Sequence, residues 1–540
     1  MKASSGAVQK ALFLIAFLVA VWHWIHVATA PLSLIAQYLP DDTFYYLEVA
    51  RNLAMHGLSS VDGGQTTTTG YHLLWAWISK VIALLVGFDR MAILRGMIFA
   101  SGALALSTVL AVGVYAWRRS LMLLSVLTLA ITSFSFLYNS VSAMEWSLVI
   151  VFSTATAFVL ASTEKNPKPG LALAGLFVIG LLGSLSRSDF GGQTACYLAA
   201  ALAVWLIRGE KRYFLPSLSA LLGASAGLGV TFYRDYLLTG SIVQGSARMK
   251  SIWSKVGGHS PLPFMPVMAR SVIYDLIHRP KLIHHTVASL NQEPQHGTVH
   301  LTGPVTTIAI LLVLAIFVAG WIWVCLRLGG GSLKTPAPTL DLFLLLSAGL
   351  TILLYAAVDI FNSFALQIWY SAQITVAIVI LLYFMAKGVA ASGRPGWAYA
   401  VLALITISNL VCFALSKPKY GPQARMLAVA PAIKQLAGNA RVGIPDSGIF
   451  NFVYGGSAIN LDGLVNNEIV EYAPDRLPCY LLDKKITYFT NFGQTAEIAL
   501  HLRPYSDYST AQTLALPDDD SVIVHQLDEA RARALPECAH

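Results

Sequence analysis

Long apolar runs, broken by short polar stretches, fill this chain of 540 residues as far as about residue 416. A helix that crosses the hydrocarbon core of a bilayer needs about 20 mainly apolar residues. The pattern therefore predicts a polytopic, mainly α-helical membrane module over 1–416. Its eleven predicted spans are 11–31, 92–117, 120–138, 144–162, 170–187, 190–207, 214–236, 303–327, 340–358, 365–386 and 397–416.

The composition agrees with a bilayer environment. Hydrophobic residues make up 56% of the chain and charged residues 12%, with a mean hydropathy of +0.62, whereas about 25% of the residues of a soluble domain are charged. The net charge is +8. In a membrane protein, basic residues mark cytoplasmic loops more often than contacts to nucleic acid, so we expect no nucleic-acid partner.

The basic clusters predict the orientation of the chain. They all fall on one side of the predicted spans, and the positive-inside rule makes that side cytoplasmic. The N-terminus would then be cytoplasmic, and the tail 417–540 would lie outside, which in a bacterial inner membrane is the periplasm. The clusters are Lys2 with Lys10, Arg118 with Arg119, Lys165 with Lys168, Arg208 with Lys211 and Arg212, Arg327 with Lys334, and Lys387 with Arg394.

One further apolar stretch, 71–88, decides this topology. If it spanned the membrane, Arg118 and Arg119 would lie outside and the orientation of every later segment would be inverted. The alternative is that 71–88 spans and one later segment does not. We favour a re-entrant or surface-lying helix here. The loops 32–91 and 237–302 then face outward together with the tail.

The start of the chain allows two interpretations. Ala28, Thr29 and Ala30 are typical of a signal-peptidase site. Pro31 follows directly, however, and the apolar run is long enough to span, so we expect an uncleaved first helix.

The tail 417–540 has the pattern of a small soluble domain. Short apolar runs at 441–445, 457–463 and 486–492 predict strands, and a short helix is expected after the first of them. Strands that alternate with helices favour an α/β layer with parallel pairing. Cys479 and Cys538 both lie in this tail, so they could form a disulfide in an oxidising compartment.

Two adjacent acids, Asp41 and Asp42, follow the first predicted span, in the stretch LPDDTFYYLEVARNL. An acid at this position could simply cap the helix that follows. It could also be a general base that takes a proton from an alcohol attacking an activated sugar. The second interpretation better explains why there are two acids, and why Glu48 and Arg51 lie in the same loop.

A leaving group such as a lipid phosphate needs cationic side chains nearby. Four basic residues are expected at the outer membrane surface: Arg95, Arg187, Arg248 and Lys250. Arg187 could alternatively form an ion pair with Asp189 at a helix end.

Four sequence segments resemble bacterial members of the GT-C superfamily. These segments are DDTFYYLEVARNLAMHG (41–57), DGGQTTTTGYHLLW (62–75), SAMEWSL (142–148) and INLDGLVN (459–466). GT-C proteins are polytopic glycosyltransferases that use polyprenyl-phosphate sugars, and they include relatives of the protein O-mannosyltransferases and of the aminoarabinose and arabinofuranosyl transferases. The resemblance implies a membrane-bound, inverting glycosyltransferase with a small α/β periplasmic domain. Its acceptor would be a hydroxyl of a glycan, a lipid or a protein.

The resemblance also assigns roles to individual residues. It implies a catalytic base in the first outward loop, which matches Asp41 or Asp42, with a slight preference for Asp41, and a second acid in the next outward loop, which matches Glu145. Glu145 could instead be a favourable charge in the first turn of a helix. Tyr46 and His72 are expected beside the site. Thr69 and Leu73 replace the Asn and Pro that the family usually has, which affects the expected sugar contacts.

The cofactor is left open by the sequence. His284, His285, His296 and His300 match no metal-ligand spacing, so no metal ligands are assigned. Some related enzymes use a divalent cation and others do not, so a divalent cation is a candidate cofactor.

Two other functions fit part of the pattern. A transporter or flippase for lipid-linked sugars would place charges along a path, but such proteins usually have paired repeats and none is evident. An O-antigen-type polymerase or ligase would instead depend on the outward loop 237–302, with Arg248 and the loop histidines.

Overall fold

The computed structural model describes nine stretches of the chain. They are 2–163, 169–256, 339–361, 371–391, 395–415, 422–473, 475–490, 504–515 and 521–538.

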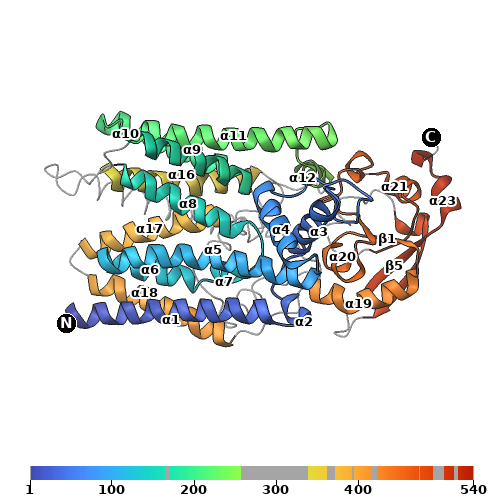
Figure 1. The fold of residues 1–540 in the computed structure, drawn as a ribbon, viewed down its shortest axis with the longest axis horizontal. Coiled ribbons are helices and arrows are strands. Elements are labelled where there is room, and N and C mark those ends of the chain that lie inside the picture. The colour runs from blue at the N-terminus through green and yellow to red at the C-terminus, as the bar shows by residue number, and fades with distance from the viewer. Residues whose placement is uncertain are drawn as a thin grey trace, which may run out of the picture.

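A helical bundle forms the first part of the molecule, and its helices run along the long axis (Figure 1). Ten of the eleven predicted spans correspond to described helices, while 303–327 lies outside the described residues. The bundle helices are α1 (Lys2–Thr29), α5 (Arg90–Arg119), α6 (Leu121–Ile131), α7 (Phe134–Val141), α8 (Trp146–Ser162), α9 (Pro169–Ser186), α10 (Phe190–Arg208), α11 (Phe214–Thr239), α16 (Thr339–Phe361), α17 (Ala372–Ala391) and α18 (Pro395–Leu415).

Six of these helices are long and apolar enough to cross a membrane, so the chain is a multi-pass membrane protein. The bent pair α6 and α7 adds a seventh span if the two are counted together, with an angle of 64° between them. Ser133 lies at this break, and its hydroxyl accepts a hydrogen bond from the Phe136 amide, which caps α7.

The loop 32–91, which the sequence predicts to face outward and which we call the outward loop, folds over one end of the bundle. It contains α2 (Leu32–Ile35), α3 (Asp41–Met55) and α4 (Leu73–Val86). With 14 residues, α4 is about 21 Å long, which is shorter than the hydrocarbon core of about 30 Å. It packs against α3 and α5 at the end of the bundle. This length agrees with a helix that does not span.

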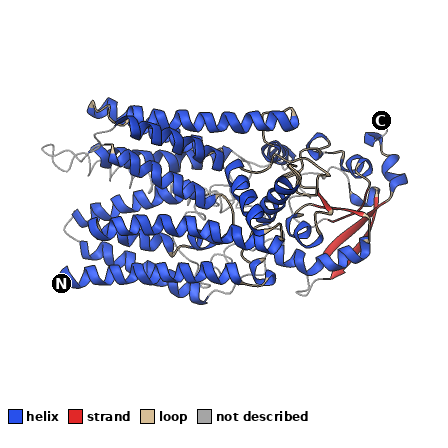
Figure 2. Cartoon of the chain, in the orientation of Figure 1, coloured by secondary structure: helices blue, strands red, loops and turns tan. Residues whose placement is uncertain are grey.

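The C-terminal part is an α/β layer that follows α19 (Pro422–Ala437) (Figure 2). The strand order is β2-β1-β3-β5-β4. β1 pairs with β2 and with β3 in parallel, as predicted, whereas β3 with β5 and β5 with β4 are antiparallel. The remaining elements are β1 (Arg441–Ile444), α20 (Gly448–Tyr454), β2 (Ala458–Asn460), η3 (Ile469–Glu471), α21 (Leu477–Asp483), β3 (Ile486–Thr490), η4 (Tyr505–Asp507), β4 (Ser509–Ala515), β5 (Ser521–Leu527), α23 (Glu529–Arg533) and η5 (Pro536–Cys538).

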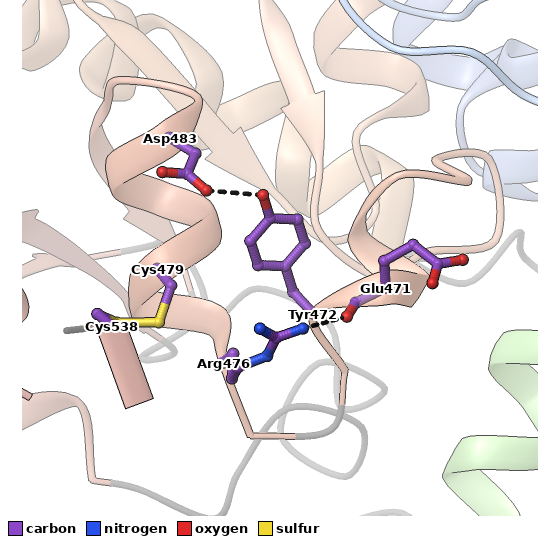
Figure 3. The surroundings of a disulfide bond; sticks show 6 residues. All are labelled: Glu471, Tyr472, Arg476, Cys479, Asp483 and Cys538. Atoms are coloured by element: carbon purple, nitrogen blue, oxygen red, sulfur yellow. Dashed lines mark hydrogen bonds between the residues drawn. A yellow bond between two sulfur atoms is a disulfide. The ribbon is translucent and has the colours of Figure 1, made fainter. Parts of the chain in front are cut away.

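A disulfide joins Cys479 on α21 to Cys538 near the C-terminus, with their Cα atoms 5.2 Å apart (Figure 3). The pairing that the sequence suggested is therefore present. It ties the last described residues to the helical side of the C-terminal layer. Next to it, the Tyr472 hydroxyl donates to an Asp483 carboxylate oxygen at 2.7 Å.

The C-terminal layer and the outward loop share one hydrophobic core. Phe44 on α3 and Phe452 on α20 pack edge to face, with ring centroids 5.4 Å apart. Burial of such aromatic side chains supplies much of the energy of a packed interface. The C-terminal layer is thus held directly against α3, the helix that carries the acid pair.

Candidate functional site

Asp41 is held by the backbone of the C-terminal layer. Its Oδ2 accepts from the Gly448 amide at 2.8 Å, and its Oδ1 accepts from the Ile449 amide at 3.1 Å. A carboxylate in this position satisfies free N–H groups at the start of α20. Asp41 is also buried. Both of its oxygens are therefore engaged in joining α3 to α20.

Asp42, the next residue, has different surroundings. None of the hydrogen bonds between described residues engages its carboxylate. Burial raises the pKa of Asp42 to about 7, and the positive charge of Lys250 on α12 (Gly245–Val256) acts in the opposite direction, while Asp41 and Glu145 raise the pKa further. A carboxyl with such a pKa can accept a proton near neutral pH.

Glu145 begins α8 but does not cap it, because its side chain makes no hydrogen bond to the helix backbone. Its side chain is buried, and Oε2 has no hydrogen-bond partner. Its Oε1 lies 3.8 Å from His72 Nε2. An unpaired oxygen in a buried carboxylate is costly, and a favourable charge at the start of a helix does not by itself explain that cost.

Contacts from the outward loop fix the turn that presents Glu145. Ala143 has φ +55°, a left-handed conformation that is uncommon for a residue with a side chain. The Trp75 indole N–H donates to the Ala143 carbonyl at 2.8 Å, and the Thr43 hydroxyl donates to the Ser142 carbonyl at 2.5 Å. The motifs around 43, 75 and 143 thus hold one another in place.

Tyr46 and His72, which the sequence predicts to lie beside the site, lie next to Glu145. The His72 amide donates to the Tyr46 hydroxyl at 3.1 Å. Burial raises the pKa of the Tyr46 hydroxyl, and the negative charge of nearby Glu145 raises it further. Burial lowers the pKa of the His72 imidazole, and the positive charge of Arg187 acts in the same direction, whereas Glu145 opposes it. We call Asp42, Tyr46, His72, Glu145 and Lys250 the interfacial site.

Arg187 lies close enough to affect His72, but its guanidinium faces Asp189. It binds that carboxylate with two hydrogen bonds, Nε to Oδ1 at 3.1 Å and Nη2 to Oδ2 at 2.9 Å. The Tyr355 hydroxyl and the Gln373 amide donate to the same carboxylate at 2.9 and 3.0 Å. The ion pair considered from the sequence is therefore formed, at the edge of the interfacial site.

Two of the predicted phosphate-binding residues have other neighbours. Arg248 pairs with Glu471 of η3, with Nη2 2.6 Å from Oε1. Arg95 lies on the exposed side of α5, with Nη2 3.4 Å from the Ala30 carbonyl. The structure brings Lys250 to the acids and places Arg187 nearby, but it does not bring Arg95 or Arg248 there.

Sequence reasoning missed a second group, next to Asp41. The Tyr45 hydroxyl accepts from the Ser447 amide at 3.1 Å and lies 3.2 Å from Asp462 Oδ2. Burial raises the pKa of Asp462 to about 7, and burial together with the charges of Asp41 and Asp462 raises the pKa of Asp446 well above its usual value. The signal was available, because Asp446 and Asp462 each follow a strand of a parallel pair, and such strand ends meet at one edge.

No arrangement suited to a metal ion is found among the described residues, where no three Asp, Glu, His or Cys side chains cluster appropriately. The histidines of the loop 237–302 lie outside the described residues.

No protein-family model and no curated protein matches the chain. Solved structures do match it. The apo crystal structure of the Archaeoglobus fulgidus oligosaccharyltransferase gives a TM-score of 0.54 at 13% identity, over 89% of this chain and 69% of that one. Its complex with Zn and sulfate gives 0.53 at 12% identity, over 96% and 76%.

A third structure, of archaeal oligosaccharyltransferase AglB from the same organism with an inhibitory peptide and a dolichol-phosphate, gives a TM-score of 0.51 at 11% identity, over 95% of this chain and 74% of that one. Oligosaccharyltransferases of this kind have the GT-C fold. The fold that the resemblance implied is therefore confirmed. At these low sequence identities, the similarity is evidence about the fold and not about the activity.

Proposed function

We propose that this protein is an inverting glycosyltransferase of the membrane, which transfers a sugar from a polyprenyl-phosphate donor to a hydroxyl group outside the cytoplasm. The observation that carries this proposal is the interfacial site itself. There, an Asp42 carboxyl free of hydrogen bonds from the described residues is subject to the charges of Glu145 and Lys250, and it lies on helix α3, which packs against α20 of the C-terminal layer.

Asp42 acts as the base, in preference to Asp41. As the acceptor oxygen attacks the anomeric carbon, its proton passes to the Asp42 carboxylate. The bond from that carbon to the phosphate oxygen breaks, and the electron pair leaves with the lipid phosphate. Asp41 does not suit this role because both of its oxygens already accept backbone hydrogen bonds from α20.

Lys250 stabilises the departing phosphate, since a cation is most effective where negative charge develops in a site with little water. Arg187, paired with Asp189, borders the site. Glu145 offers its unpaired oxygen to a substrate hydroxyl, while Tyr46 and His72 hold the Glu145 carboxylate in position.

The partners follow from the same proposal. The archaeal structure contains dolichol-phosphate and a peptide; for this chain we propose a polyprenyl-phosphate-linked sugar as donor and a glycan, lipid or protein as acceptor. The basic clusters support a C-terminal layer on the side of the membrane away from the cytoplasm, which we propose is the periplasmic side of a bacterial inner membrane. A divalent cation is a candidate cofactor because an archaeal structure contains Zn, but the described residues of this chain form no cluster suited to hold it.

The test is donor turnover by the full-length protein in nanodiscs. A panel of polyprenyl-phosphate sugars is offered, and release of the polyprenyl phosphate is followed. Asp42→Asn should lower the rate by about a hundred- to ten-thousand-fold, the usual effect of losing a general base.

Asp41→Asn is the matched control. It keeps the shape and size of the side chain, and the rate per folded molecule should fall far less than in Asp42→Asn. Full turnover by Asp42→Asn, with a donor that the wild type uses, would refute the assignment.

A further inference from the structure

An apolar cavity of about 370 Å³ lies inside the bundle, between α5, α6, α8, α16 and α17. Its walls include Val112, Leu127, Phe158 and Ile380. On α8 the lining extends from Ile150 to Ala161, which corresponds to about 16 Å along the helix axis. The space is therefore elongated along the membrane normal, like an extended hydrocarbon chain.

The rim of the cavity at the end of α5 carries positive charge. Arg119, the last residue of α5, lines the rim and is exposed. Asp341 also lines it, but its carboxylate is neutralised by an ion pair with Lys387. The rim lies at the end of the bundle farthest from the C-terminal layer (Figure 1), where Arg119 is available to an anionic group.

Polar side chains form a hydrogen-bonded group at the inner end of the cavity, the end close to Glu145 in the chain. Phe136 lines that inner end. Beside it, the Ser135 and Ser371 hydroxyls hydrogen bond at 2.9 Å, and the Trp146 indole N–H donates to Ser371 Oγ at 3.3 Å. Arg119 is the one basic residue among the described residues that line the cavity, and it lies at the other end, so a lipid phosphate bound there belongs to the leaflet opposite the interfacial site.

We propose that the cavity binds one acyl chain of a phospholipid from the leaflet opposite the interfacial site, with the lipid phosphate at Arg119. Apolar walls favour a hydrocarbon chain, and the guanidinium at the rim matches a phosphate in charge and geometry. This lipid is distinct from the proposed sugar donor, and the inference does not depend on the proposed function.

The inference is tested by native mass spectrometry of the full-length protein released from mild detergent. Any lipid that stays bound is identified. Arg119→Glu should lower the phospholipid-bound fraction at least about fivefold, the effect of one basic residue beside an anionic lipid. Ala157→Phe places a ring in the cavity and should abolish binding. Ala157→Leu, a smaller intrusion, should give an intermediate loss if the larger variant fails to fold.

Two matched controls keep the result specific. Arg118 is exposed and adjacent to Arg119 but does not line the cavity, and Ala111 is an exposed residue of α5 outside it. Arg118→Glu and Ala111→Phe should bind phospholipid as the wild type does. Equal binding in all variants would overturn the proposal, and so would a retained lipid that proved to be a polyprenyl phosphate.

Discussion

Asp41 and Asp42 are adjacent carboxyl groups in different surroundings, and the difference predicts a pH profile. Because the pKa of Asp42 is raised to about 7, a base at this position is ionised only above that pH. Turnover should therefore rise as the pH increases through about 7 and be lost below it. Lys250→Gln removes the charge that favours the ionised form, so the midpoint should move to higher pH.

The measurement is the initial rate of polyprenyl-phosphate release as a function of pH. Arg248→Gln is the control, because Arg248 lies on the same helix as Lys250 but pairs with Glu471; its midpoint should equal that of the wild type. A midpoint that stays in place in Lys250→Gln would argue against Asp42 as the titrating base.

At the scale of elements, the close approach of α20 to α3 depends on Gly448. A Cβ at this position would lie 2.7 Å from both the carbonyl oxygen and Oδ1 of Asp41. Gly448→Ala must therefore push the two helices apart, with an expected loss of about 1–3 kcal/mol. Gly175→Ala, where nothing lies within 4 Å of the added atom, should leave stability unchanged or improve it by about 0.5–1 kcal/mol.

Thermal unfolding of both variants in detergent compares the two glycines directly. A melting temperature of Gly448→Ala equal to that of Gly175→Ala would mean that the contact with Asp41 is not tight.

A comparison of individual elements shows which parts of the fold could be predicted from the sequence. Apolar run length is a local property, so nearly every described span was predicted, as were β1, β2 and β3. β4 was missed because most of its residues are exposed and its sequence STAQTLA lacks an apolar face. The choice between Asp41 and Asp42 also depended on a distant partner, because the amides that engage Asp41 lie about 400 positions further along the chain.

For the whole molecule, the acids between the outward loop and the C-terminal layer link stability to pH. Burial raises the pKa values of Asp41, Asp446 and Asp462 above 3.8, so the folded protein binds more protons than the unfolded chain. Stability should then be greatest below about pH 4 as far as these groups are concerned, and it should fall as the pH rises toward about 7. Melting temperatures between about pH 5 and 8 should decrease.

Asp446→Asn tests this linkage because an amide keeps the shape of the protonated acid and cannot ionise. The variant should melt at a higher temperature than the wild type at pH 8, and the gap should narrow as the pH falls and the wild-type carboxyl takes up a proton. Asp507→Asn, on η4 and away from these acids, is the control and should leave the profile unchanged. A gap that stays constant across this range would show that Asp446 does not couple the docking of the C-terminal layer to pH.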